Sequence, residues 1–339
     1  MPTTATKNAQ FRLAARPVGL PKRTDWNLTT DPLDEPAPGS VLVKVLYLSL
    51  DPAMRGWMNE GRSYIEPVRL GAVMRAAGVG RVVTSADPTF AAGDAVAGSL
   101  GVQEYATLPA HALKRIDPAA VALPVQLSVL GLPGMTAYFG LLDVGQATHG
   151  DTVVVSGAAG AVGMTVGQIA KIKGCRAIGI AGGAPKCRFI VEELGFEAAI
   201  DYKSQDVATA LRAHCPDGID VYFDNVGGET LDACLGRLAR HARVVICGAI
   251  SQYNATSAIR GPSNYLSLLV NRARMQGMVV FDYADRYAEA EREMVQWMKE
   301  GRLKSREDIV FGLDTFPDAL LKLFNGENFG KLVLQVAPE

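Results

Sequence analysis

The segment from Val153 to Gly174, VVVSGAAGAVGMTVGQIAKIKG, has small residues at a spacing that can bind a cofactor containing phosphate. Gly160 would let the backbone approach a pyrophosphate, and Gly163 would let the following helix pack close to a sheet. The N–H groups at the start of that helix would face the anion. The first glycine position of the usual fingerprint holds Ala158. Tight packing of a strand against a helix can produce a similar turn, so only a series of such units around it favours dinucleotide binding.

The end of the next expected strand indicates which dinucleotide would bind. A site for NAD usually has Asp or Glu about 20 residues past the glycines, where it accepts a hydrogen bond from the ribose 2′-hydroxyl. The segment GIAGGAPKCRF offers Ala181, Gly182 and Gly183 there, followed by Lys186 and Arg188. Because a lysine binds a 2′-phosphate that a carboxylate would repel, the sequence predicts NADPH. The alternative is that Lys186 is a solvated residue in the first turn of a helix.

Residues that other classes of enzyme need are missing from the chain. A catalytic zinc ion requires three converging ligands, but the cysteines all lie at or after Cys175 and the first half holds only His111 and His149. Neither a Tyr-x-x-x-Lys pair nor the G-x-S-x-G motif of hydrolases occurs. We therefore expect hydride transfer without a metal. An electron-poor C=C bond suits this chemistry, because a neutral donor such as tyrosine can stabilise charge that collects on a carbonyl oxygen.

The composition is that of a soluble globular protein with two domains, at 339 residues, 48% hydrophobic and 20% charged. A net charge of −1 provides no basic field to attract nucleic acid or an anionic membrane. The N-terminal stretch MPTTATKNAQFRLAARP lacks the apolar core of a secretory signal, and no apolar run is long enough to span a membrane. Five irregularly spaced cysteines are expected to be free thiols, so the expected location is the cytoplasm.

The pattern of elements changes along the chain. The first half is expected to be β-rich, with short strands such as GSVLVKVLYLSL and GVGRVVTS separated by Gly, Pro and Asp. From about residue 127, apolar strands that begin near residues 152, 175, 197, 220 and 243 alternate with expected helices. Near-continuous Val and Ile runs are typical of parallel strands covered on both faces. The fold class is therefore α/β, with a doubly wound parallel sheet of the Rossmann type.

Motifs spread over nearly the whole chain resemble those of one enzyme family. They include LYLSLDPAMRGWM, GLPGMTAYFGLLDVG, GAAGAVG, YFDNVGGE, VICGAISQYN and GENFGKLVL. The chain resembles the zinc-independent medium-chain dehydrogenases/reductases of the prostaglandin reductase type, also called leukotriene B4 dehydrogenases. Alkenal double-bond reductases and curcumin reductase-like enzymes belong to the same group.

The resemblance implies a GroES-like β-rich domain at residues 1–126 and a Rossmann NADPH-binding domain at 127–300. Residues 301–339 would return to the first domain. It also implies a homodimer that uses NADPH to reduce the C=C bond of α,β-unsaturated aldehydes and ketones, with hydride delivered to the β-carbon.

The resemblance also assigns roles to individual residues. Lys186 and Tyr202 would bind the 2′-phosphate, and Tyr253 would be the catalytic residue at the substrate carbonyl. The full set of residues implied to contact the cofactor is Gly160, Ala161, Val162, Gly163, Lys186, Tyr202, Asn225, Cys247, Gly248, Ala249, Ile250, Ser251, Tyr253, Val280, Phe281 and Asn328. Each has a structural alternative: Tyr202 as the cap of a strand end, DNVGG and Asn328 as parts of turns, Tyr253 as a packed aromatic.

The expected substrate-binding residues are Met54, Tyr64, Tyr253, Phe281 and Tyr283. One departure from the family lies next to Met54, because many relatives carry tyrosine where this chain has Ala53. The change removes a bulky wall and a hydroxyl, so the family's substrates do not transfer directly to this chain. Two alternatives to an enone reductase stay open: a quinone oxidoreductase of the same superfamily, and an NADPH-binding protein without turnover.

Overall fold

The computed structural model describes residues 6–339, which form two compact units. The first unit contains the described residues up to Leu127 together with Glu307–Glu339, and the second contains Ser128–Arg306. The sequence predicts no secretory signal in the N-terminal stretch. Residues 1–5 of that stretch lie outside the described residues. No helix within residues 6–339 combines the length and apolar character that crossing a membrane requires.

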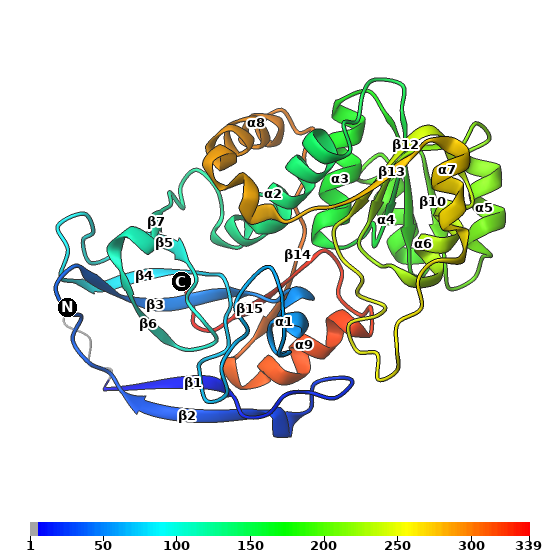
Figure 1. Ribbon diagram of the computed structural model, residues 1–339. Helices are drawn as coiled ribbons and strands as arrows, with labels where there is room; N and C mark the ends of the chain where they lie inside the picture. The colour runs from blue at the N-terminus through cyan, green and yellow to red at the C-terminus, as the bar shows by residue number, and fades with distance from the viewer. Residues whose placement is uncertain (1–5) are drawn as a thin grey trace. The chain divides into compact units, whose positions relative to one another are not determined.

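The second unit is built on a parallel sheet of six strands with the order β10-β9-β8-β11-β12-β13. Figure 1 shows the strands side by side with helices packed around them. The strands are β8 (Thr152–Ser156), β9 (Arg176–Ala181), β10 (Ala198–Asp201), β11 (Ile219–Asp224), β12 (Leu238–Ile246) and β13 (Arg274–Gly277). The α/β class and the Rossmann-type sheet predicted from the sequence are confirmed. The short sixth strand, β13, was not among the predicted strands.

Helices alternate with these strands, as the spacing of the apolar runs predicts. They are α2 (Leu132–Phe139), α3 (Ala161–Ile172), α4 (Ala184–Glu192), α5 (Val207–His214), α6 (Gly228–Leu235), α7 (Ser267–Asn271) and α8 (Tyr287–Lys299). All five residues of β8 are buried, because strands covered by helices on both faces have no polar side. The chain leaves α3 through Gly174, whose φ of 80° is a left-handed conformation that favours glycine.

The side of the sheet to which the chain adds new strands changes between β8 and β11. From β8 the chain moves to β9 and β10 on one side, and from β11 it moves to β12 and β13 on the other. The helical connections of the two halves therefore diverge at the carboxyl ends of β8 and β11. Ligands of open α/β sheets bind at such a switch point, so this edge is where a cofactor is expected.

The first unit contains an antiparallel hairpin and a seven-stranded mixed sheet. The hairpin is β1 (Lys7–Leu13) and β2 (Trp26–Pro32). The sheet has the order β14-β15-β3-β4-β5-β7, with β6 paired to β3. Its strands are β3 (Ser40–Ser49), β4 (Gly78–Ser85), β5 (Ala95–Gly98), β6 (Tyr105–Pro109), β7 (Lys114–Arg115), β14 (Glu307–Phe311) and β15 (Lys331–Gln335). The unit also contains α1 (Ala53–Trp57) and α9 (Phe316–Phe324). The β-rich first half predicted from the sequence is confirmed.

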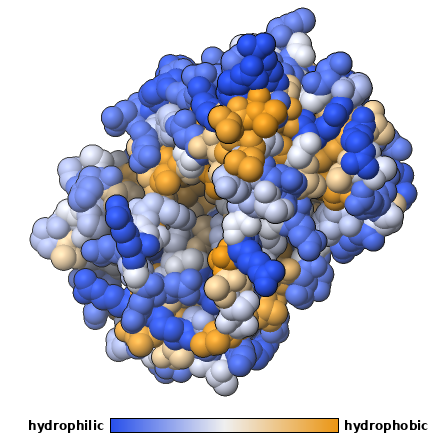
Figure 2. Space-filling view, turned by 45° about the vertical axis from the view of Figure 1, so that its right-hand side comes forward, coloured by the Kyte–Doolittle hydropathy of each residue, from blue (hydrophilic) through white to orange (hydrophobic). Residues whose placement is uncertain are grey.

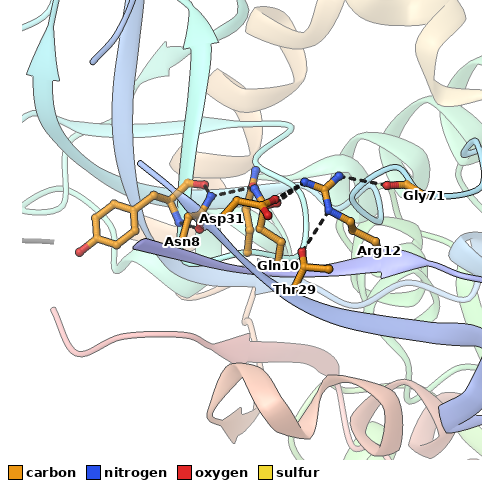
Figure 3. A network of polar contacts seen from close by, with 8 residues as sticks. Asn8, Gln10, Arg12, Thr29, Asp31 and Gly71 are labelled. Atoms are coloured by element: carbon orange, nitrogen blue, oxygen red, sulfur yellow. Dashed lines mark hydrogen bonds and ion pairs between the residues drawn. The ribbon is translucent and has the colours of Figure 1, made fainter. Parts of the chain in front are cut away.

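Polar side chains connect the hairpin to the rest of the first unit (Figure 3). Arg12 on β1 donates to Thr29 Oγ1 (3.1 Å) and Asp31 Oδ2 (2.5 Å) on β2, and to the carbonyl of Gly71 (3.0 Å). Asn8 donates through Nδ2 to the carbonyl of Tyr105 at 2.8 Å. Two strands alone are marginally stable, and these contacts hold the hairpin in place.

A buried ion pair fixes the segment in front of α1. Lys331 on β15 is 2% exposed, and its Nζ donates to Asp51 Oδ1 (2.8 Å) and to the carbonyl of Leu50 (2.6 Å). Asp51 also accepts the hydroxyl of Ser49 at 2.5 Å. A buried ammonium needs such partners, because an unpaired one would cost several kcal/mol. The C-terminal strand therefore holds the start of the segment that contains Ala53.

Candidate functional site

The glycine-rich turn after β8 makes a close contact with α3. Gly157 has a φ of 62°, and its carbonyl oxygen accepts the N–H of Gly160 at 2.9 Å. A Cβ on Gly163 would lie 2.3 Å from that same oxygen, a distance that no side chain tolerates. A Cβ on Gly160 would meet it only at 3.3 Å. Packing therefore requires glycine at 163, whereas at 160 a Cβ would make a tight contact that a small shift of the turn could relieve.

The start of α3 offers backbone donors to a ligand. Gly160 is the N-cap residue in an extended conformation, and no described side chain caps the helix there. The first N–H groups of a helix have no partner within the helix, and the helix dipole adds positive potential at this end. Ala161, Val162 and Gly163 supply these groups directly above the carboxyl end of β8. The arrangement fits a pyrophosphate, so the residues present are suited to a dinucleotide.

At the end of β9 lie the residues predicted to select the dinucleotide. Gly182 and Gly183 form the turn into α4, and Lys186 lies in the first turn of that helix. The ring of Tyr202 covers this turn from the segment after β10, because a Cβ on Gly182 would be 2.8 Å from the Tyr202 hydroxyl. Tyr202 is 50% exposed, so one side of the ring can still meet a ligand. The structure thus brings Lys186 and Tyr202 to the same turn.

A carboxylate that the sequence analysis did not consider lies at this turn. Asp201, the last residue of β10, accepts the N–H of Gly183 at 2.8 Å and that of Lys203 at 3.0 Å. The hydrogen bond from the Gly183 backbone is the main reason that the pKa of Asp201 lies below its usual value. The acid thus orders the Gly182–Gly183 turn. The signal in the sequence is an acidic residue at the end of the third strand of the series, one strand beyond the position at which a dinucleotide site usually carries its acid.

Asn225 follows β11 and holds the ends of two strands together. Its Nδ2 donates to the carbonyl of Ser156 at 2.7 Å, and its backbone N–H donates to the Ser156 hydroxyl at 2.9 Å. A Cβ on Gly157 would lie 3.5 Å from the Asn225 side chain. The DNVGG segment and the glycine-rich turn are therefore neighbours at the switch point of the sheet.

The loop after β12, from Cys247 to Tyr253, folds against the same edge. The N–H groups of Ile250 and Ser251 donate to the carbonyls of Asn225 and Val226, both at 3.2 Å. Burial, with a contribution from Asp224, raises the pKa of the Cys247 thiol to about 12. Cys247 is therefore a neutral thiol at physiological pH and not a nucleophile.

Tyr253 lies at the end of this loop with its hydroxyl directed back to the loop's start. The hydroxyl oxygen accepts the N–H of Ala249 at 3.1 Å, and a Cβ on Gly248 would lie 2.8 Å from it. Accepting this bond uses an oxygen lone pair, and a phenol in this role donates through its own hydrogen. The loop thus fixes the position of the phenol at the carboxyl edge of the sheet.

Other predicted site residues of the second unit lie in the segment Val280–Arg286. The carbonyl of Val280 accepts the hydroxyl of Tyr287 at 2.9 Å. Phe281 is 39% exposed, whereas Tyr283 stacks on Phe139 with ring centroids 4.8 Å apart. This contact occupies one face of the Tyr283 ring with a core aromatic, so Phe281 offers the more accessible apolar surface.

The remaining predicted residues belong to the first unit. Met54 is fully buried in its hydrophobic core. Tyr64 is 55% exposed, and its hydroxyl accepts the indole N–H of Trp57 at 3.3 Å. Asn328 donates through Nδ2 to the carbonyl of Gly330 at 3.0 Å, which is the turn that was named as its structural alternative. Of the three, Tyr64 presents the exposed aromatic surface.

Residues 6–339 contain no group of three His, Cys, Asp or Glu side chains arranged to hold a metal ion. The five cysteines are free thiols, of which Cys175, Cys215 and Cys234 are buried.

Two family models match this chain. One, described as the N-terminal domain of oxidoreductase, matches residues 9–116, and the other, described as zinc-binding dehydrogenase, matches residues 161–300. The second description names a metal that this chain's described residues have no cluster to bind.

Individual proteins match over almost the full length. The NADPH-dependent curcumin reductase of Escherichia coli is 44% identical over 98% of this chain and 97% of its own. The 2-alkenal reductase (NADP(+)-dependent) of Nicotiana tabacum is 41% identical over 98% of each chain. The crystal structure of CurA from Vibrio vulnificus in complex with NADPH superimposes with a TM-score of 0.93, at 45% identity, over 98% of this chain and 100% of that one.

The two glycines of the turn generate a paired prediction. Gly163→Ala places a methyl group against the Gly157 carbonyl, so it should lower the free energy of unfolding by about 1–3 kcal/mol. Gly160→Ala places a methyl group 3.3 Å from the same oxygen, a tight contact that a small shift can relieve, so stability should stay within about 1 kcal/mol of wild type while NADPH binding weakens. Chemical denaturation and cofactor titration measure the two quantities. Equal loss of stability in both variants would contradict the different roles assigned to the two glycines.

Proposed function

The chain belongs to the medium-chain dehydrogenase/reductase superfamily, as one of its NADP-dependent oxidoreductases, and we propose that it uses NADPH to reduce the C=C bond of α,β-unsaturated aldehydes and ketones. Full-length similarity to a 2-alkenal reductase and to a curcumin reductase supports this reaction. The similar structure holds NADPH, and the turn after β8 fits the pyrophosphate that NADPH carries.

The observation that carries the proposal is the position of Tyr253. A phenol fixed by the Ala249 N–H at the carboxyl edge of the sheet can donate to an oxygen on which negative charge develops. Reduction of an enone needs such a neutral donor and no metal, because the conjugated carbonyl itself accepts the charge. An isolated alcohol–ketone exchange would need stronger polarisation of the carbonyl.

In the proposed reaction, bound NADPH supplies a hydride to the β-carbon of the substrate. The other steps are a hydrogen bond to the carbonyl oxygen and the transfer of a proton. Tyr253 donates a hydrogen bond to the carbonyl oxygen as the electron pair of the C=C bond moves toward it. A proton from Tyr253 or from water then binds to the α-carbon. One hydride and one proton are added, so the products are the saturated carbonyl compound and NADP⁺.

The dinucleotide contacts follow from the same edge of the sheet. Gly160, Ala161, Val162 and Gly163 would bind the pyrophosphate through their backbone. Lys186 would pair with the 2′-phosphate through a charge-assisted hydrogen bond, and Tyr202 would lie beside it. Exposed Tyr64 and Phe281 are proposed as substrate contacts, each within its own unit.

The test of the function is NADPH oxidation, followed at 340 nm, against a panel of enals, enones and quinones with product identification. Rapid formation of saturated carbonyl compounds supports the proposal. Preferential formation of quinols would assign the chain to the quinone oxidoreductases of the same superfamily. Tight NADPH binding with no turnover on any acceptor would favour a binding protein.

Tyr253→Phe tests the catalytic residue. Loss of one donor to a developing oxyanion costs roughly 100-fold in rate, so turnover should fall by about that factor while NADPH affinity stays nearly unchanged. Tyr138→Phe is the matched control, because Tyr138 is a tyrosine of the same unit, 3% exposed and outside the site. Wild-type turnover in the Tyr253 variant would remove the assigned role.

Lys186→Ala tests the choice of cofactor. Removing a charge-assisted contact to the 2′-phosphate should weaken NADPH binding roughly ten-fold or more and leave NADH binding unchanged. Lys171→Ala, at an exposed position in the last turn of α3, removes an equal charge elsewhere in the unit. A wild-type protein that binds NADH and NADPH equally well would contradict this part of the proposal.

We further propose a homodimer that forms through the β13 edge of the sheet. All four residues of β13 are exposed, and β12 is the one strand that pairs with it among residues 6–339. Beside it, Leu269 and Val270 on α7 are 75% and 66% exposed. Figure 2 shows hydrophobic residues gathered in patches among hydrophilic ones on the visible face of the molecule. An open edge strand beside apolar side chains suits a second copy related by a two-fold axis.

The dimer is tested by sedimentation or light scattering of the wild type and of Leu269→Glu. The charged variant should sediment as a monomer under conditions where the wild type is a dimer. A monomeric wild type, or a dimer unaffected by the substitution, would exclude this interface.

A further inference from the structure

Asp224, the last residue of β11, is a buried carboxylate that the proposed reaction does not use. It is 1% exposed, and one of its oxygens, Oδ1, accepts four hydrogen bonds. The donors are the hydroxyls of Ser156 (2.9 Å) and Tyr222 (2.8 Å) and the backbone N–H groups of Val226 and Gly227 (both 3.0 Å). The other oxygen, Oδ2, is buried with no hydrogen-bond partner among residues 6–339.

A buried polar atom without a partner lowers stability. Each such group costs about 1–3 kcal/mol, and apolar replacements of buried charged groups are often neutral or stabilising. Holding the strands together through Asp224 therefore lowers the stability of the fold relative to an apolar contact. The use of one oxygen for four donors indicates a group whose purpose is to fix the positions of its neighbours.

The bonds of Asp224 reach three segments of the candidate cofactor site. Ser156, which donates to Asp224, is the last residue before the glycine-rich turn. The Ser156 hydroxyl in turn accepts the N–H of Asn225 at 2.9 Å. The backbone carbonyl of Asp224 accepts the N–H groups of Cys247 (2.9 Å) and Gly248 (3.1 Å), where the loop after β12 begins. One residue therefore connects the carboxyl ends of β8, β11 and β12.

We propose that Asp224 is a positioning residue of the cofactor site, which sets the spacing between the glycine-rich turn and the DNVGG turn by holding Ser156 and Asn225. It acts through these residues and does not touch the cofactor. The proposal rests on the proposed binding of NADPH at this edge of the sheet.

The two hydroxyls that donate to Asp224 belong to different surroundings, one at the cofactor site and one in the hydrophobic core. Ser156 connects to Asn225 and the glycine-rich turn. Tyr222 is fully buried in the hydrophobic cluster that contains Cys234 and Leu235. Each hydroxyl makes one bond to the same oxygen, and the Tyr222 hydroxyl also interacts with Ser156. Ser156 bonds directly to Asn225 whereas Tyr222 lies in the core, so removing one hydroxyl or the other compares positioning with general stability.

The first experiment compares Ser156→Ala with Tyr222→Phe. NADPH dissociation constants come from cofactor fluorescence titration, and stability comes from thermal unfolding. Both variants should unfold at a lower temperature than wild type. Ser156→Ala should also weaken NADPH binding roughly ten-fold, whereas Tyr222→Phe should stay within about two-fold of wild type. Equal dissociation constants for the two variants would overturn the proposal.

The second experiment changes the carboxylate itself. Asp224→Asn keeps an oxygen that can accept the four donors and should retain most of the NADPH affinity, whereas Asp224→Ala should lose roughly ten-fold or more. Asp220→Ala is the matched control, because Asp220 also connects β11 to β8, accepting the N–H of Thr152 at 2.8 Å at the opposite ends of both strands. It should lower stability and leave the affinity unchanged.

If Asp224→Ala does not fold, Asp224→Asn and Ser156→Ala decide the question. Loss of affinity in the asparagine variant but not in the serine variant would overturn the proposal. So would equal affinity in the Asp224→Ala and Asp220→Ala variants. A wild-type protein that fails to bind NADPH would instead contradict the proposed function, so the two failures are distinct.

Discussion

The close approach of Gly163 to the carbonyl of Gly157 is the constraint on which the site of the second unit depends. With no side chain at 163, α3 begins directly above the carboxyl end of β8. Its first N–H groups then lie at the switch point, where the order of the strands reverses, next to the end of β11. A bulkier residue would move the helix start away, and the donors would no longer converge on the switch point. The binding properties of this edge thus follow from one packing contact.

Around that contact, the chain arranges polar groups mainly by side chain to backbone hydrogen bonds. Asp201 orders the turn after β9, and Asn225 fixes the end of β8. Asp224 accepts hydrogen bonds from β8, from its own strand and from the turn that follows it. Loops at the edge of a sheet have few apolar contacts to hold them, so buried acceptors do this work. The phenol of Tyr253 is held in the same way, by the backbone of its own loop.

The chemistry that this edge supports is narrow. Neutral Cys247 does not act as a nucleophile, and the described residues offer no metal cluster. What the loop provides is a weakly acidic hydroxyl at a fixed place. A hydride acceptor that brings its own electron sink, such as a carbonyl conjugated to the C=C bond, needs no more than that.

The sequence by itself determined the periodic features. Continuous apolar runs predicted the parallel strands, and the glycine spacing predicted the turn after β8, because these patterns reflect local geometry and burial. It did not predict β13, which is short and fully exposed and so has no apolar pattern. Nor did it single out Asp201, Asp224 or Ser156, whose hydrogen bonds between different segments join residues 18 to 69 positions apart along the chain. Only the parallel register brings those strand ends together, so the tertiary structure alone decided which polar residues order the site.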